Sequence, residues 1–132
     1  MLKLMYITNS PEVASIADGA GVDRIFIDLE QYGKEKRQKN WDSVKSKHSI
    51  SDIPKVKSAV KNAQIFVRTD PIFDGFSDEL EGVLACEPDV VMLPYFKTVR
   101  EVETFIKAVD GRATTSLLLE TRGAAEQIDD II

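Results

Sequence analysis

The sequence predicts an α/β fold of five βα units, which would form either an incomplete (β/α)8 TIM barrel or an open parallel sheet. Short apolar runs alternate with segments of helical spacing along the chain, and this alternation is typical of a parallel sheet. No Gly-, Pro- or Ser-rich linker divides the 132 residues, so residues 1–132 are expected to form a single domain. Each strand-like run ends in polar or charged residues, where parallel α/β proteins carry their ligand sites. The alternative from the same five units is an open flavodoxin-like sheet.

The strand-like runs are short. The second run, residues 23–30, is apolar at nearly every position between acidic ends, as expected for a strand covered on both faces. The expected strands cover residues 2–8, 23–30, 64–69, 89–94 and 113–120.

The expected helices have recognisable starts. Ser10 followed by Pro11 has the pattern of an N-cap and a first helical residue. Ser51 is a second expected N-cap, and Thr98 with Glu101 has the spacing of a capping box. Apolar residues at helical spacing then place helices at residues 10–20, 51–60, 77–86, 98–109 and 123–132.

Residues 31–49 break this rhythm, because they are polar and predominantly basic. The segment contains Lys34, Lys36, Arg37, Lys39, Lys45 and Lys47 against Glu35 and Asp42. We expect a mobile, solvated loop, the alternative being a lid that attracts an anionic substrate. His48, the only histidine, is expected to be a loop residue rather than a catalytic base.

The composition excludes several classes of protein. A net charge of −5 argues against general nucleic-acid binding, and no apolar stretch approaches the ~18 residues that span a bilayer. The single cysteine, Cys86, excludes an internal disulfide and is consistent with a reducing cytoplasm. We therefore expect a cytoplasmic protein that binds neither nucleic acid nor membrane.

The strand ends supply the candidate site residues. Arg68 follows a buried-type strand, where it would either bind a carboxylate of a small anionic substrate or pair with Asp28 to close the strand ends. Glu120 follows the fifth strand and offers oxygen ligands of the kind that Mg²⁺ prefers, the alternative being an exposed glutamate at a helix entrance. Carboxylates and one guanidinium at one sheet edge suit a divalent metal and a small anion.

Four strand-end motifs, in order, resemble those of the HpcH/HpaI aldolase and citrate lyase β-subunit family. The first is Ala20-Gly21-Val22-Asp23 with Ile27-Asp28-Leu29-Glu30, and the others are Phe66-Val67-Arg68, Val90-Val91-Met92-Leu93-Pro94 and Leu118-Leu119-Glu120-Thr121. The resemblance implies a (β/α)8 barrel and a lyase or aldolase that acts on a 2-oxo acid or an acyl-CoA through an enolate. It also implies a Mg²⁺ or Mn²⁺ cofactor.

The resemblance assigns roles to the strand-end residues. Arg68 would bind substrate and stabilise the enolate, Asp28 and Glu30 would be catalytic residues that orient Arg68 and metal-bound water, and Glu120 would be a metal ligand. Pro94 would line the substrate site.

The chain departs from the family pattern in three respects. The second metal carboxylate lies beyond residue 132, Gln31 stands where the aldolase branch has a histidine, and Ala85 stands near the position of the aspartate that pairs with that histidine. A full barrel takes about 250 residues, so we expect five units truncated after the fifth, inactive alone, and a homo-oligomer that pairs its exposed edges. The alternative is a non-catalytic truncated half-barrel.

Overall fold

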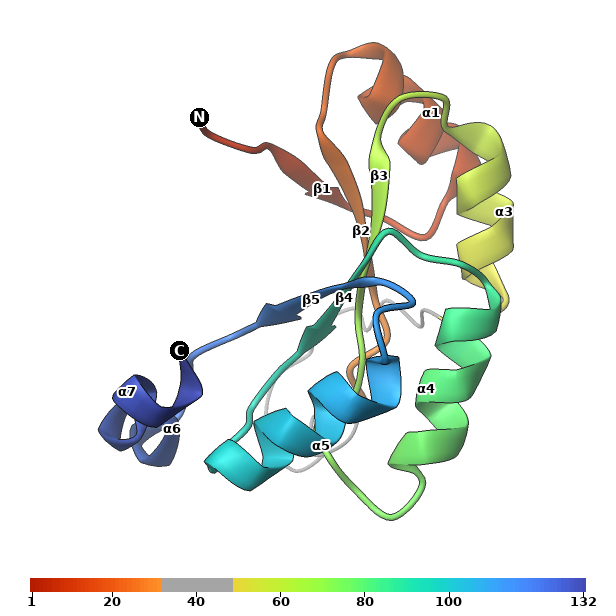
Figure 1. Ribbon diagram of the computed structural model, residues 1–132. Coiled ribbons are helices and arrows are strands. Elements are labelled where there is room, and N and C mark those ends of the chain that lie inside the picture. The colour runs from red at the N-terminus through yellow and green to blue at the C-terminus, as the bar shows by residue number, and fades with distance from the viewer. Residues whose placement is uncertain (32–48) are drawn as a thin grey trace, which may run out of the picture.

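The computed structural model describes residues 1–31 and 49–132. Within these residues five parallel strands form one sheet in the order β1-β2-β3-β4-β5. Figure 1 shows α1, α3 and α4 ranged along one side of this sheet. The strands are β1 (Met5–Ile7), β2 (Arg24–Asp28), β3 (Gln64–Arg68), β4 (Val90–Leu93) and β5 (Thr114–Leu117).

The strand order decides between the two predicted architectures. A flavodoxin-like sheet runs in the order 2-1-3-4-5, whereas a (β/α)8 barrel adds each strand next to the previous one. The observed sequential order therefore confirms the barrel-type prediction, here as an open sheet of five strands alternating with helices.

The helices of the described residues follow the expected alternation. They are α1 (Pro11–Gly19), α3 (Asp52–Ala59), α4 (Phe76–Ala85), α5 (Val99–Val109), α6 (Arg122–Glu126) and α7 (Ile128–Ile131). Ser10 caps α1 through its side chain, and Thr98 and Glu101 form the predicted capping box of α5. Ser51 precedes α3 but forms no side-chain cap bond, and the predicted final helix is divided into two short ones at Gln127.

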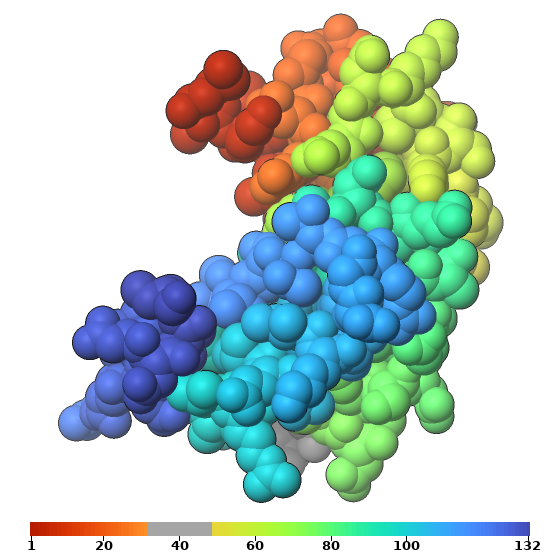
Figure 2. All heavy atoms as spheres, viewed as in Figure 1, coloured from red at the N-terminus to blue at the C-terminus, as the bar shows by residue number. Residues whose placement is uncertain are grey.

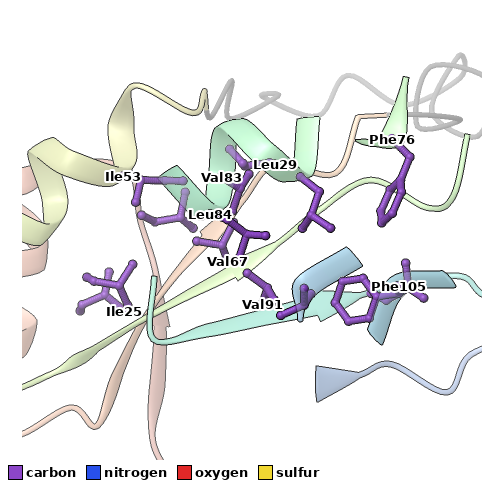
Figure 3. Packing of buried hydrophobic residues seen from close by; sticks show 14 of the residues in the cluster. Ile25, Leu29, Ile53, Val67, Phe76, Val83, Leu84, Val91 and Phe105 are labelled. Carbon is purple, nitrogen blue, oxygen red and sulfur yellow. The ribbon is translucent and has the colours of Figure 1, made fainter. Parts of the chain in front are cut away.

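The main core lies between the sheet and the helices. Residues of β2, β3 and β4 that point to the helices, such as Ile27, Val67 and Val91, are fully buried. In Figure 3, Val67 and Val91 project from the sheet towards apolar side chains of the helices, including Val83 and Phe105. Because successive side chains of a strand point to opposite faces, the residues between these face the other side of the sheet.

The opposite face of the sheet carries a smaller apolar layer. Phe26, Phe66 and Val90 are buried there, with Met92 packed against them. The Phe26 and Phe66 rings stack with their centroids 4.9 Å apart. This face corresponds to the interior of a barrel, and its layer lies directly below the charged strand ends described next.

The two edge strands are the most exposed part of the sheet. All three residues of β1 are exposed, including Ile7 at 59%, and Thr114 and Thr115 of β5 are exposed as well. Figure 2 shows the N-terminal residues and the C-terminal helices separated by a hollow on one side of the molecule. No helix in the described part of the chain is long and apolar enough to cross a membrane.

Candidate functional site

The carboxyl ends of β2 and β3 bring Arg68, Asp28 and Glu30 together. Asp28 and Arg68 are direct neighbours in the sheet register. Arg68 donates from Nε to Asp28 Oδ1 at 2.9 Å and from Nη2 to Asp28 Oδ2 at 2.5 Å, while Glu30 Oε2 lies 3.4 Å from Nε. The Arg68–Asp28 ion pair, which the sequence predicts as the alternative to substrate binding, is therefore present in the structure.

Backbone contacts hold this ion-pair cluster in place. Leu29 is buried on the helix side and donates its N–H to the Arg68 carbonyl at 2.9 Å, and the Glu30 N–H donates to Asp28 Oδ1 at 3.1 Å. The guanidinium carbon lies 5.4 Å from the centre of the Phe26 ring, so the aromatic layer supports it from below. The Arg68 side chain is 20% exposed.

The cluster fixes Arg68 as a cation. The hydrogen bond with Asp28 is the main cause that raises the pKa of Arg68, and the charges of Glu30 and Glu120 add to it. Among the described residues, none accepts a hydrogen bond from Nη1 of Arg68. One corner of the guanidinium is thus available to an incoming anion.

Glu120 lies on the other side of Arg68, beyond β5. It is exposed, and its Oε1 accepts the backbone N–H of Tyr95 at 2.9 Å. Tyr95 directly follows Pro94, which is buried at the end of β4. Four adjacent strands therefore bring the five predicted site residues, Arg68, Asp28, Glu30, Pro94 and Glu120, to one end of the sheet.

A pair of carboxyl groups near this end was not predicted. Asp70 accepts the Gln31 N–H at 2.6 Å and donates its own N–H to Glu79 Oε1 at 3.0 Å. The pKa of Glu79 is raised to about 7, mainly by burial and in smaller part by the negative charge of Asp70, while the hydrogen bond from the Asp70 N–H opposes the shift. The polar pair Thr69-Asp70 after β3 was a usable signal for Asp70, whereas Glu79 looked like an ordinary first-turn residue of a helix.

The described residues do not make up a divalent-cation site on their own. Asp28 and Glu30 contact Arg68, Asp70 accepts the Gln31 N–H, and Glu120 accepts the Tyr95 N–H. Within residues 1–31 and 49–132, no three His, Cys, Asp or Glu side chains lie where they could hold one metal ion. Mg²⁺ and Mn²⁺ sites usually need one or two carboxylates besides water or substrate oxygens, so Glu120 provides at most one ligand.

The structure also shows the contacts or exposure of three residues outside this cluster. Asn9 donates to Asp52 at 3.4 Å, and Cys86 is half-buried with its Sγ 3.5 Å from the Gly82 carbonyl. Ala85 is exposed at the end of α4. The predictions for the basic segment and His48 fall outside the described residues.

Comparison with known proteins supports the barrel geometry. Residues 3–129 match the family model described as HpcH/HpaI aldolase/citrate lyase. No curated protein sequence matches the chain.

Solved structures with the same fold are distant in sequence. They include the HpcH/HpaI aldolase from Desulfitobacterium hafniense DCB-2, with a TM-score of 0.67 and 12% identity, and the citrate synthase SbnG, with 0.70 and 14%. An HpcH/HpaI aldolase/citrate lyase family protein from Burkholderia cenocepacia J2315 has a TM-score of 0.60 and 15% identity. The three alignments cover 98%, 98% and 93% of this chain but 57%, 56% and 45% of the respective relatives. The chain therefore spans about half the length of these structures.

Proposed function

Because the chain belongs to the HpcH/HpaI aldolase/citrate lyase family, we propose that it carries the substrate-binding end of a carbon–carbon lyase. The substrate would be a small 2-oxo acid or an acyl-CoA that reacts through an enolate. The observation that supports this proposal is Arg68, a guanidinium fixed by Asp28 and Glu30 where two neighbouring strands end.

Arg68 is suited to both binding and charge stabilisation. A substrate carboxylate or carbonyl oxygen would accept a hydrogen bond from Nη1. When the carbon–carbon bond breaks, its electron pair moves into the 2-oxo group, and negative charge grows on that oxygen. A donor that is already held in position favours this charged state over the neutral carbonyl. Asp28 and Glu30 would act by keeping the guanidinium in place, and Pro94 would line the site.

The proposed reaction would also need a metal and a general base. Glu120 is the residue by which this chain would contribute to a Mg²⁺ or Mn²⁺ site, and further ligands would have to come from outside the described residues. We assign no step to the metal. Gln31 and Ala85 carry no ionisable side chain, so we assign them no role as a base.

The test compares two arginines that pair with carboxylates. Arg68→Gln should weaken pyruvate binding to the 132-residue chain by about tenfold or more, because the charged donor is lost. Arg112→Gln is the matched control, since Arg112 forms a similar two-point pair with Glu81 on the outer surface. Binding would be measured by titration calorimetry or NMR shifts. Equal pyruvate affinity for wild type and Arg68→Gln would reject the proposal.

A second candidate function is a non-catalytic half-barrel that assembles with another copy of the chain. It is favoured by the exposed apolar residues of β1, including Met5 and Ile7, which a paired edge would bury. Homo-oligomer formation along residues 2–7 and 114–119 is compatible with either function.

A further inference from the structure

We propose that Tyr95 and Lys97 form a second anion-binding arm of the site, which selects substrates that carry a second negative group. The inference rests on the proposed function, because the first negative group is the one that Arg68 would bind. It is carried by the loop between β4 and α5, which bears these two side chains and bonds to Glu120 through the Tyr95 N–H.

The β4 side of this loop is rigidly held. The Tyr95 N–H donates to Glu120 Oε1 at 2.9 Å, and the Phe96 carbonyl accepts the Thr121 hydroxyl at 2.6 Å. Phe96 itself is 2% exposed and belongs to the main core. Both anchors come from the segment after β5, so the loop and Glu120 keep a fixed relation to each other.

The α5 side of the loop is held as firmly. The Lys97 N–H donates to Glu101 Oε2 at 2.6 Å, and the Lys97 carbonyl accepts Gln127 Nε2 at 3.3 Å. Gly123 packs so closely that a Cβ there would lie 3.0 Å from the Lys97 carbonyl oxygen. The Lys97 backbone is therefore fixed, while its side chain is exposed.

Tyr95 has a costly backbone conformation. Its φ is +49°, in the left-handed region, which is unfavourable for a residue other than glycine. This conformation directs the chain around the corner after Pro94 and leaves Tyr95 37% exposed. Glycine or asparagine would adopt it more easily, so the presence of an aromatic residue points to a use for the ring.

The ring of Tyr95 positions the Lys97 ammonium group. Lys97 Nζ lies 5.6 Å from the ring centre, within the range of a cation–π contact. Among the described residues, no carboxylate lies within ion-pair distance of Lys97. At the site end of the sheet, the described residues thus include Arg68, which is already paired, and Lys97, which is oriented by an aromatic ring.

The second negative group would be a carboxylate or a phosphate. A dicarboxylic 2-oxo acid supplies the first, and an acyl-CoA supplies the second. Lys97 is a flexible, hydrated point charge that would accept either group. Tyr95 acts as a positioning residue through its contact with Lys97.

The experiment compares ligands that differ by the second charge. Pyruvate is paired with 2-oxoglutarate, and malonylpantetheine with malonyl-CoA, in binding titrations of the 132-residue chain; the shorter member of each pair carries one carboxylate. For the pair whose additional anionic group Lys97 binds, we expect the longer ligand to bind about three- to tenfold more tightly than its partner, as a partly exposed charge pair would provide. Lys97→Gln should remove this preference and leave binding of the shorter ligand unchanged.

Matched variants separate the possible outcomes. Lys97→Arg should keep the preference, Tyr95→Leu should reduce it, and Lys107→Gln, an exposed lysine in the last turn of α5, should have no effect. If pyruvate binding depends on Arg68 but Lys97→Gln leaves both ligand ratios unchanged, this inference is overturned and the proposed function stands. If wild type binds none of the four ligands, both are overturned.

Discussion

Arg68 pairs with Asp28 and is also the proposed substrate-binding residue. Asp28 engages its Nε and Nη2 atoms, which satisfies two partly buried carboxylate oxygens and fixes the guanidinium plane. Among the described residues, every fully buried side-chain nitrogen or oxygen has a hydrogen-bond partner. Because Nη1 has no partner among these residues, it is not fully buried, and solvent or a substrate can reach it. The same ion pair therefore stabilises the strand ends and prepares the proposed site.

Removing Arg68 should destabilise the fold in a pH-dependent way. Arg68→Ala removes the guanidinium that contacts both Asp28 and Glu30, two adjacent, partly buried carboxylates, and we expect a loss of about 1–3 kcal/mol at pH 8. Protonation relieves the repulsion between the two carboxylates, so lowering the pH to about 5 should recover part of the loss. Urea unfolding at both pH values measures this. Asp28→Asn combined with Arg68→Ala should be less destabilised at pH 8 than Arg68→Ala.

Glu79 should make the stability of the wild-type chain fall with rising pH. Burial raises its folded-state pKa to about 7 from an ordinary value of 4.5. Between these values the folded state binds the proton and the unfolded state does not, so the stabilisation present below about pH 4.5 is lost as the pH rises to about 7. Glu79→Gln, which resembles the protonated form, should flatten the dependence in urea unfolding between pH 5 and 8. Glu103→Gln on the exposed face of α5 should not.

At the scale of elements, the apolar runs and cap residues were sufficient to predict the alternation of strands and helices. The predicted positions of the strand ends were less accurate, because the neighbouring strands decide where the hydrogen-bonded pairing stops. The expected fifth strand, residues 113–120, is shortened to Thr114–Leu117. Its neighbour β4 ends at Leu93, and Pro94 has no N–H with which to continue the ladder.

Tertiary contacts explain the other differences between prediction and structure. The predicted final helix breaks at Gln127, whose side chain bonds to the Lys97 carbonyl of another loop. Glu79 contacts Asp70 because α4 begins at Phe76 after an irregular turn. The spacing of apolar residues in the sequence does not predict the geometry of such a turn. The Arg68–Asp28 pair was predictable because both residues end neighbouring parallel strands.

The capping box of α5 offers a test at the scale of this element. The Thr98 side chain accepts the Glu101 N–H at 3.2 Å, and the Glu101 side chain accepts the Thr98 N–H at 3.1 Å. Thr98→Ala should cost about 1 kcal/mol in urea unfolding, because an N-cap bond is lost. Thr104→Ala, on the exposed surface of the same helix, should change stability by less than about 0.5 kcal/mol. An equal loss of stability in Thr98→Ala and Thr104→Ala would show that the N-cap bond does not stabilise the fold.

At the scale of the whole molecule, the sheet has an apolar inner face and two open edges. Ile7 lies in register with Phe26, on the face that a barrel would enclose, yet it is 59% exposed. We expect the chain to associate through β1 and β5, and Ile7→Lys to shift it towards the monomer in light scattering over a range of concentrations. Ile16→Lys is the control, since Ile16 is 73% exposed on α1, away from the sheet edge. A clean monomer for the wild type at every concentration would contradict this.

The activity of the chain should be limited by its supply of carboxylates. Glu120 provides one ligand, and Mg²⁺ dehydrates reluctantly for a single carboxylate, so metal binding to the 132-residue chain should be weak. We therefore expect no chelator-sensitive release of pyruvate or oxaloacetate by this chain, with Mg²⁺ or Mn²⁺ present. A chain extended by further βα units that supply a second carboxylate should gain this activity, and Arg68→Ala or Glu120→Ala in the extended chain should abolish it. Turnover by the 132-residue chain that a chelator stops would show instead that it holds a complete metal site.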